Sequence, residues 1–273
     1  MINELAETYR YRELLLNLVT RDLRVRYKNS VLGFFWSLVN PLVQVATITV
    51  VFKYILHASG RDYSAYLLCA FLPWMFFQMS VLDSAMSVLF HGNLVKKTYF
   101  PREILPASIV LSNLVHFVLA LVVFFIYLLV IGSPIRATWL LLPVVIGIQL
   151  MLNMGIAFFV SCLNVFYDDI KYLTTVILNL LYFGLPIMYF SEQVFNSDRI
   201  PHFVAVLMCY GNPLALLLTA YRKILLPPYN YQTIHDVPLN YGYLALAGVT
   251  SLIILVAGYA FFNSKKWYFA ERI

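Results

Sequence analysis

The sequence predicts an all-α integral membrane protein with six transmembrane helices per subunit, and three observations support this expectation. First, 62% of the 273 residues are hydrophobic and only 12% are charged, whereas about 25% of residues are charged in a typical soluble domain. Second, the apolar residues form long blocks, several of about 20 residues or more, the length that crosses a hydrocarbon core about 30 Å thick. Third, the charges flank these blocks, which favours a membrane protein over a nucleic-acid-binding protein despite the net charge of +6.

The N-terminal segment, residues 1–30, is expected to be cytoplasmic and to carry an amphipathic interface helix. Wound as a helix, residues 10–28 place polar and basic side chains on one arc and apolar side chains on the other, which suits a helix lying on the inner leaflet. Three charges interrupt the apolar arc (Arg12, Asp22 and Arg26), which indicates a protein neighbour there. The residues assigned to this interface are Arg21, Asp22, Arg24, Arg26, Tyr27 and Lys28. The alternative is a basic flank that only sets topology.

The transmembrane domain is predicted to cover residues 31–263, followed by a cytoplasmic tail at 264–273. Its spans are expected at about 31–56, 64–90, 104–131, 138–163, 172–190 and 241–262. An even number of spans places both termini on one side of the membrane. Most basic residues fall on that side, namely Arg10, Arg12, Arg21, Arg24, Arg26, Lys28, Lys96, Lys97, Arg102, Lys171, Lys265, Lys266 and Arg272. The positive-inside rule therefore assigns both termini to the cytoplasm.

The long segment 191–240, between the fifth and sixth spans, is expected to be external. It contains two semi-apolar runs, 202–210 and 213–226, which prolines bracket. Neither run is long enough, with its breaks, to be a clear span. We expect short re-entrant or interfacial helices here, and the alternative is a membrane hairpin that would bring the number of spans to eight.

The cytoplasmic loop between the second and third spans has an unusual composition, HGNLVKKTYFPREILP at 91–106. Its lysines can be explained by topology, but its Tyr-Phe-Pro run cannot. We expect both aromatic side chains to face solvent, because exposed aromatics framed by charges and stiffened by proline are typical of a docking site for a soluble partner. The residues assigned to this docking are Lys96, Lys97, Tyr99, Phe100, Pro101, Arg102 and Glu103. The alternative is a loop that serves only as a topology signal.

Two aromatic clusters are predicted inside the spans. The run FLPWMFFQ (71–78) lies in the second span and YFGLPIMYF (182–190) lies at the end of the fifth. Aromatic faces suit sugar rings, which have apolar faces and polar edges, so a passage for a glycan is one interpretation. Helix packing and anchoring at the membrane surface are the other. The residues concerned are Phe71, Trp74, Phe76, Phe77, Tyr182, Phe183 and Tyr189.

Two ionisable side chains, Asp83 and His116, are expected inside the second and third spans. Such residues often mark ion or proton paths in membrane proteins. No paired acid and base can be recognised at mid-membrane, so we expect a structural role for both. Cys69, Cys162 and Cys209 are isolated in the sequence, which indicates buried free thiols rather than a metal site or a disulfide framework.

Four segments together resemble the permease subunits of ABC transporters that export polysaccharides, the Wzm-like O-antigen, TagG-like teichoic-acid and capsular exporters of the type-2 class. They are RDLRVRYKNSVLGFFWSLVNP (21–41), NLVKKTYFPREILP (93–106), LNVFYDDIKY (163–172) and NPLALLLTAYRKILL (212–226). The resemblance covers nearly the whole chain. It implies a homodimer with two copies of a separate ATPase, and a conduit between the subunits for a lipid-linked glycan.

The resemblance also assigns further residues. It places gating helices in 191–240, with Asn212, Pro213, Tyr221 and Arg222, and adds Phe34 and Trp36 to the conduit lining. It extends ATPase coupling to Asp168 and Asp169 in the second cytoplasmic loop, where the family commonly has arginine at the position of Asp168.

The chain has no phosphate-binding loop, because no glycine is followed by lysine anywhere in the sequence. We therefore expect no catalytic residues, no metal and no cofactor on this chain, with ATP and Mg held by the partner ATPase. An ion-coupled carrier or channel without an ATPase is the alternative, but it needs a coupling-ion site that the sequence does not offer. An integral-membrane transferase is a third possibility, and the scattered histidines do not favour it.

Overall fold

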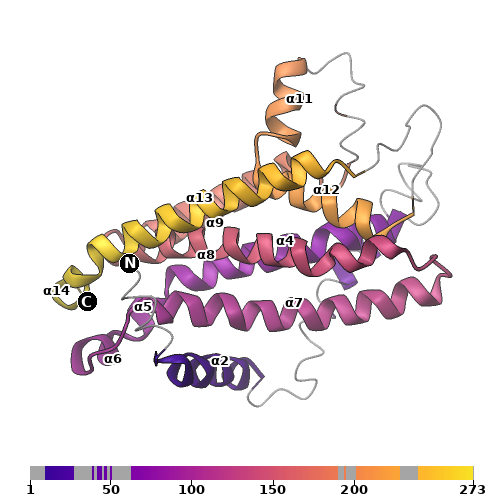
Figure 1. Cartoon of the computed structure of the whole chain (residues 1–273). Helices are drawn as coiled ribbons and strands as arrows, with labels where there is room; N and C mark the ends of the chain where they lie inside the picture. The colour runs from indigo at the N-terminus through magenta and orange to yellow at the C-terminus, as the bar shows by residue number, and fades with distance from the viewer. Residues whose placement is uncertain are drawn as a thin grey trace.

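The computed structural model describes residues 10–27, 63–189, 201–227 and 239–272, together with positions 39, 42–44, 46–47, 50 and 194. In these ranges the chain is helical and contains no strand (Figure 1). The described helices are α2 (Arg12–Tyr27), α4 (Tyr63–Ala85), α5 (Ser87–Phe90), α6 (Gly92–Lys97), α7 (Ile104–Val130), η2 (Ala137–Leu141), α8 (Leu142–Phe166), α9 (Ile170–Gly184), α11 (His202–Cys209), α12 (Pro213–Leu225), α13 (Tyr241–Lys265), η3 (Lys266–Tyr268) and α14 (Phe269–Arg272).

Four of the six predicted spans are confirmed as helices long and apolar enough to cross a membrane. They cover Tyr63–Ala85, Ile104–Val130, Ala137–Phe166 and Tyr241–Tyr268. The predicted first span, 31–56, falls where the structure describes only scattered positions. The predicted fifth span, 172–190, is α9, whose 15 residues rise only about 22 Å, less than a hydrocarbon core of about 30 Å.

The predicted short helices of the region 191–240 are present as α11 and α12. The two helices meet at a bend of 72° between Cys209 and Pro213. Asn212 starts α12 because its side-chain oxygen accepts a hydrogen bond from the Leu214 backbone N–H at 2.9 Å, and Pro213 occupies the first helical position, where its missing N–H is not needed. In Figure 1, α12 lies against the bundle and α11 projects away from it.

A buried polar seam joins α4, α8 and α12. The Gln149 amide donates to the Pro73 carbonyl at 2.7 Å, and the Tyr221 hydroxyl donates to the Gln149 side-chain oxygen, also at 2.7 Å. One turn further along α8, the Asn153 amide donates to the Ser80 hydroxyl at 3.3 Å. Because buried polar groups are costly without partners, these bonds fix how the three helices face one another.

The helices α8 and α13 pack with their backbones in contact at two glycines. A Cβ atom at Gly258 would lie 2.2 Å from the Gly155 carbonyl oxygen, and a Cβ atom at Gly155 would lie 2.7 Å from the Ile254 backbone. Neither distance leaves room for a methyl group. Small residues that let membrane helices approach closely are a common basis of their association, so these two glycines set the α8–α13 contact.

A second apolar cluster, separate from the main core, closes one end of the bundle. This end cluster consists of Leu18, Val88, Val95, Phe100, Ile104, Leu105, Phe158, Cys162, Val165, Tyr259, Phe262 and Phe269. It therefore draws α2, the short helices α5 and α6, the start of α7, and α14 to the same end (Figure 1). Residues 264–273 were predicted only as a tail. Within them Phe269 is fully buried, since its ring packs against Phe166 and Phe262.

Candidate functional site

The segment predicted to dock a soluble partner lies between α6 and α7, and its two aromatic residues have opposite environments. Tyr99 is 74% exposed, whereas Phe100 is only 6% exposed and belongs to the end cluster. The expectation that both aromatics face solvent is therefore wrong for Phe100. The physical reason is that α13 and α14 return to this end of the bundle and cover it. Lys96 and Lys97, in the last turn of α6, are exposed beside Tyr99.

The rest of this segment also faces inward. Pro101 is buried, and the Arg102 guanidinium donates to the Lys266 carbonyl. Partial burial lowers the pKa of Arg102. Glu103 is 3.6 Å from the Lys266 ammonium. Arg102 and Glu103 were predicted to meet a partner protein, and in this structure they contact α13 and η3 of their own chain.

The second predicted coupling loop, between α8 and α9, is presented to solvent. Asp168 and Asp169 are exposed together with Tyr167. The loop is held by Asn164, whose side-chain oxygen accepts from the Lys171 backbone N–H at 3.0 Å and whose amide contacts the Met86 sulfur at 3.3 Å. Met86 lies at the junction of α4 and α5, so this loop is at the same end of the bundle as α6.

The interface helix α2 packs along α7, and its contacts are partly ionic. Arg26, which interrupts the predicted apolar arc, donates to Asp83 at 2.6 Å and to the Asn113 side-chain oxygen at 3.0 Å. Arg21 pairs with Asp22 at 2.7 Å and contacts His91, at the α5–α6 junction. Arg24 is exposed, and Lys28 lies outside the described residues, as does the side chain of Tyr27.

The two aromatic clusters do meet, but inside a single subunit. Tyr182 packs against Trp74 and Phe71, with ring centroids 5.7 Å and 6.3 Å apart. Phe76 stacks on Phe117 at 5.0 Å. Trp74 is 1% exposed, and Phe71, Phe76 and Phe77 are similarly enclosed. For these four side chains the structure supports the packing interpretation, because their surfaces are already covered by α7, α8 and α9.

Phe183 differs from the other aromatics, since it is 71% exposed on α9. Tyr189 is half-buried and its hydroxyl donates to the Gly184 carbonyl at 2.7 Å. Phe34 and Trp36, which were also assigned to the conduit, lie outside the described residues. Among the predicted lining residues that the structure describes, Phe183 is the one that faces away from its own subunit.

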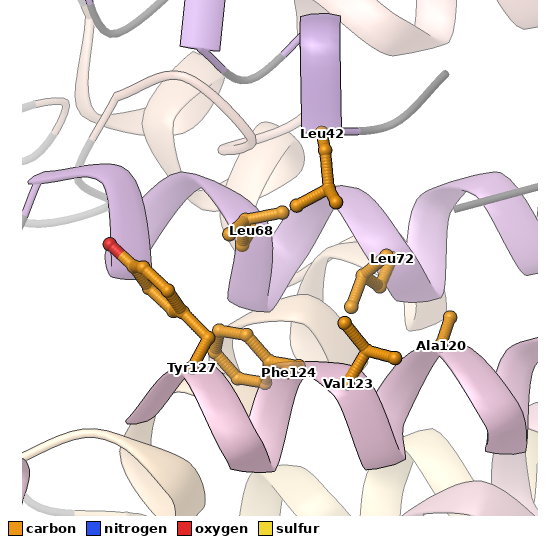
Figure 2. Close-up of a pocket in the computed structure, with 7 residues that line it drawn as sticks. All are labelled: Leu42, Leu68, Leu72, Ala120, Val123, Phe124 and Tyr127. Carbon is orange, nitrogen blue, oxygen red and sulfur yellow. The ribbon is translucent and has the colours of Figure 1, made fainter. Parts of the chain in front are cut away.

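Figure 2 shows an apolar pocket between α4 and α7. Its volume is about 20 Å³, and its lining consists of Leu42, Leu68, Leu72, Ala120, Val123, Phe124 and Tyr127. A cavity of this size holds little more than one water molecule. It cannot accommodate a sugar ring, so this pocket is not a passage for a glycan.

The predicted gate residues divide between capping and burial. Asn212 and Pro213 start α12, as described above, whereas Tyr221 is fully buried and its ring contacts Phe117 at 5.9 Å. Arg222 is 5% exposed. Its guanidinium donates to the carbonyls of Pro186, Ile187 and Tyr189, and therefore ties α12 to the segment that follows α9.

Comparison with known families shows where this arrangement belongs. Residues 13–226 match the family described as ABC-2 type transporter. The chain belongs to this family. It is 31% identical over 260 residues to the O-antigen export system permease protein RfbA of Klebsiella pneumoniae, covering 95% of this chain and 94% of that protein. It is also 31% identical over 277 residues to the protein of the same name from Myxococcus xanthus, covering both chains completely.

Membership of the ABC-2 type transporter family implies an ATPase partner and makes this chain a multi-pass membrane permease subunit. Among the described residues, no group of three His, Cys, Asp or Glu side chains could hold a metal ion. Cys69, Cys162 and Cys209 are buried, and no disulfide joins any two of them. Exposed groups at the end of the bundle that the end cluster closes include those of α6 and of the α8–α9 loop.

Sequence reasoning missed three contacts of this ABC-2 permease. The partner of Asp83 is Arg26, and a signal for it was available, because an acid in a span and a base on an apolar helix face both need a counter-charge. The contact between Glu103 and Lys266 joins positions far apart in the sequence and had no local signal. Gln149 was not singled out, although a lone amide in an apolar helix usually has a buried partner.

Proposed function

We propose that this chain is the membrane subunit of an ATP-driven exporter that moves a lipid-linked polysaccharide from the cytoplasm across the cytoplasmic membrane. The observation that carries the proposal is the near-complete alignment with two proteins named as O-antigen export permeases. The substrate is then an O-antigen-type glycan on a lipid carrier. Two copies of this chain form the conduit, with six spans each and both termini in the cytoplasm, and two ATPase subunits supply the energy.

Any energy from ATP must come from another polypeptide, because the chain has no phosphate-binding loop. The surface proposed for ATPase docking consists of Lys96, Lys97, Tyr99, Tyr167, Asp168 and Asp169, all exposed at the same end of the bundle. We call this the docking patch. It combines an aromatic anchor with charges of both signs, the composition expected of a protein interface with a polar rim.

The proposal is tested by export in a strain that lacks this chain and makes a lipid-linked O-antigen. We expect export to be restored by the chain together with its ATPase, and not with an ATPase whose nucleotide site is inactivated. Restoration by this chain with the inactive ATPase would overturn the proposal and favour an ion-coupled carrier.

Docking is tested by three alanine variants of neighbouring residues. Tyr99→Ala should weaken pull-down of the ATPase by about 2 kcal/mol or more, because truncating an aromatic anchor is costly, and should leave thermal stability unchanged. Lys96→Ala should weaken it much less, as a charge at the rim of an interface. Phe100→Ala should instead lower stability by about 3 kcal/mol or more, because it empties a buried site. Equal pull-down by Tyr99→Ala and wild type would remove Tyr99 from the interface.

A further inference from the structure

The segment between α6 and α7, which carries Tyr99 of the docking patch, is joined to the end of α13 and to η3 by a buried ion pair between Glu103 and Lys266. The Lys266 ammonium and the Glu103 carboxylate are 3.6 Å apart, and their side chains are only 11% and 3% exposed. The Tyr259 hydroxyl donates to the other oxygen of Glu103 at 3.4 Å. The Arg102 guanidinium donates to the Lys266 carbonyl. Two consecutive residues at the start of α7 therefore contact α13 and η3 at three points.

This ion pair is a poor way to stabilise the fold. Removing two charges from water costs several kcal/mol per ion, and apolar residues of similar volume are often as stable or more stable in the same place. A buried ion pair does specify geometry, because moving one of the two charges away leaves the other buried without a counter-charge. Here it specifies the position of the segment next to Tyr99 relative to the end of α13.

We infer that the Glu103–Lys266 pair is the mechanical link through which movement of the docking patch reaches α13. The inference rests on the proposed function, since it assumes that an ATPase acts on the docking patch. From α13 the movement passes to α8 across the Gly155–Gly258 contact. From α8 it reaches α4 and α12 through Gln149, which bonds both the Pro73 carbonyl and Tyr221. Glu103 and Lys266 are thus positioning residues of the transport cycle.

The segment after α13 is held in place by packing, so the Lys266 side of the ion pair is fixed. Lys266 lies in η3, and Phe269 directly after it is fully buried between Phe166 and Phe262. The helix α14 also contacts α6. Because both sides of the ion pair are held in the end cluster, a displacement of Glu103 is transmitted to Lys266 instead of being absorbed by a loose chain end.

The deciding experiment removes both charges while keeping the volume. The variant Glu103→Met with Lys266→Met should fold with wild-type thermal stability or better and should still bind the ATPase. The amount of glycan exported per ATP hydrolysed should nevertheless fall by at least about fivefold, which is the lower end of the typical coupling between two sites. The charge swap Glu103→Lys with Lys266→Glu should recover most of this loss. Lys265→Met, an exposed neighbour, is the matched control and should export normally.

A stable double-methionine variant with wild-type export per ATP would overturn the inference and leave the pair a packing feature. A second readout does not depend on transport. Spin labels at Lys96→Cys and Trp267→Cys should give one narrow distance distribution in the wild-type background and a broader one with the two methionines. An unchanged distribution would also overturn the link, whereas absence of ATP-dependent export by the wild-type complex would count against the proposed function alone.

Discussion

The guanidinium of Arg222 lies 3.6 Å from the centre of the Tyr66 ring and also donates to the Tyr66 carbonyl at 3.3 Å. Among the described residues no carboxylate pairs with this arginine, whose positive charge is held by carbonyl oxygens and an aromatic face. Arg222 comes from α12, Tyr66 from the start of α4, and the remaining carbonyls from residues 186–189 after α9. One side chain therefore joins three elements.

We expect Arg222→Lys to loosen this junction although the charge is kept. An ammonium cannot reproduce the planar fork that reaches several carbonyls at once, and hydrogen bonds to charged groups contribute about 1.5–3 kcal/mol each. The measurement is thiol labelling of Ile187→Cys, a position that is fully buried in the structure. Labelling should become fast in the Arg222→Lys background and stay slow with the exposed control Arg24→Lys. Slow labelling in both backgrounds would show that the carbonyls are held by other contacts.

Gly155→Ala should destabilise the bundle by about 1–3 kcal/mol, because the added methyl group forces α8 and α13 apart. Gly147 lies on the same helix, and a Cβ atom there would meet nothing within 4 Å. Gly147→Ala should therefore be neutral or stabilise by about 0.5–1 kcal/mol, as expected for removing glycine from a helix interior. Thermal unfolding of the two purified variants in the same detergent makes the comparison. Equal midpoints would contradict the close backbone contact.

Arg26→Gln should partly release α2 from the bundle. The lost ion pair with Asp83 is about one-third exposed, so its own contribution is expected to be at most about 1 kcal/mol. The loss of the Asn113 contact adds to it. Protease cleavage within α2 reports the release, and Arg24→Gln, on the exposed side of the same helix, is the matched control. Identical cleavage rates for the two variants would show that the Arg26 contacts are not needed to hold α2 against the bundle.

Phe183→Ala and Trp74→Ala test two different roles of an aromatic side chain. Phe183 is exposed and could face a passage or a second subunit, whereas Trp74 is buried in the packed interior. Trp74→Ala should lower stability by about 3–5 kcal/mol, the usual cost of emptying a buried aromatic site. Phe183→Ala should leave stability unchanged and reduce glycan export or association of the two subunits. Export and dimer content are measured on membranes with matched amounts of each variant. Normal values for Phe183→Ala would mean that this side chain contacts only lipid.

Much of the architecture could be predicted because length and hydropathy are local properties. The third span, expected at 104–131, is observed at Ile104–Val130, and the fourth, expected at 138–163, is observed at Ala137–Phe166. The fifth was predicted too long because apolar composition continues past Gly184, although Leu185 is already extended. The backbone leaves the helix one residue before Pro186, as the restricted conformation of residues preceding proline requires.

The fate of individual site residues was less predictable. Tyr99 and Phe100 are neighbours with similar side chains, and only the return of α13 and α14 to this end of the bundle decides which one is buried. The same return determines the partners of Arg102 and Glu103. Trp74 and the run at 182–190 were recognised as two aromatic clusters, but their contact through Tyr182 was not predicted. Whether such clusters pack together or line a passage depends on how α7 and α8 lie beside them, and the sequence pattern alone does not position these helices.

The shortness of α9 has a consequence for the lipid around it. If α9 crosses the bilayer, its 15 residues leave roughly 8 Å of a hydrocarbon core unspanned, and local thinning of the bilayer is one response to such a hydrophobic mismatch, at a cost of fractions of a kcal/mol per Å. Leu173, Ile177 and Leu180 are exposed along this helix and would hold the thinned leaflet against it. A polar cargo crossing beside α9 would then meet a thinner barrier than it would anywhere along α7, α8 or α13.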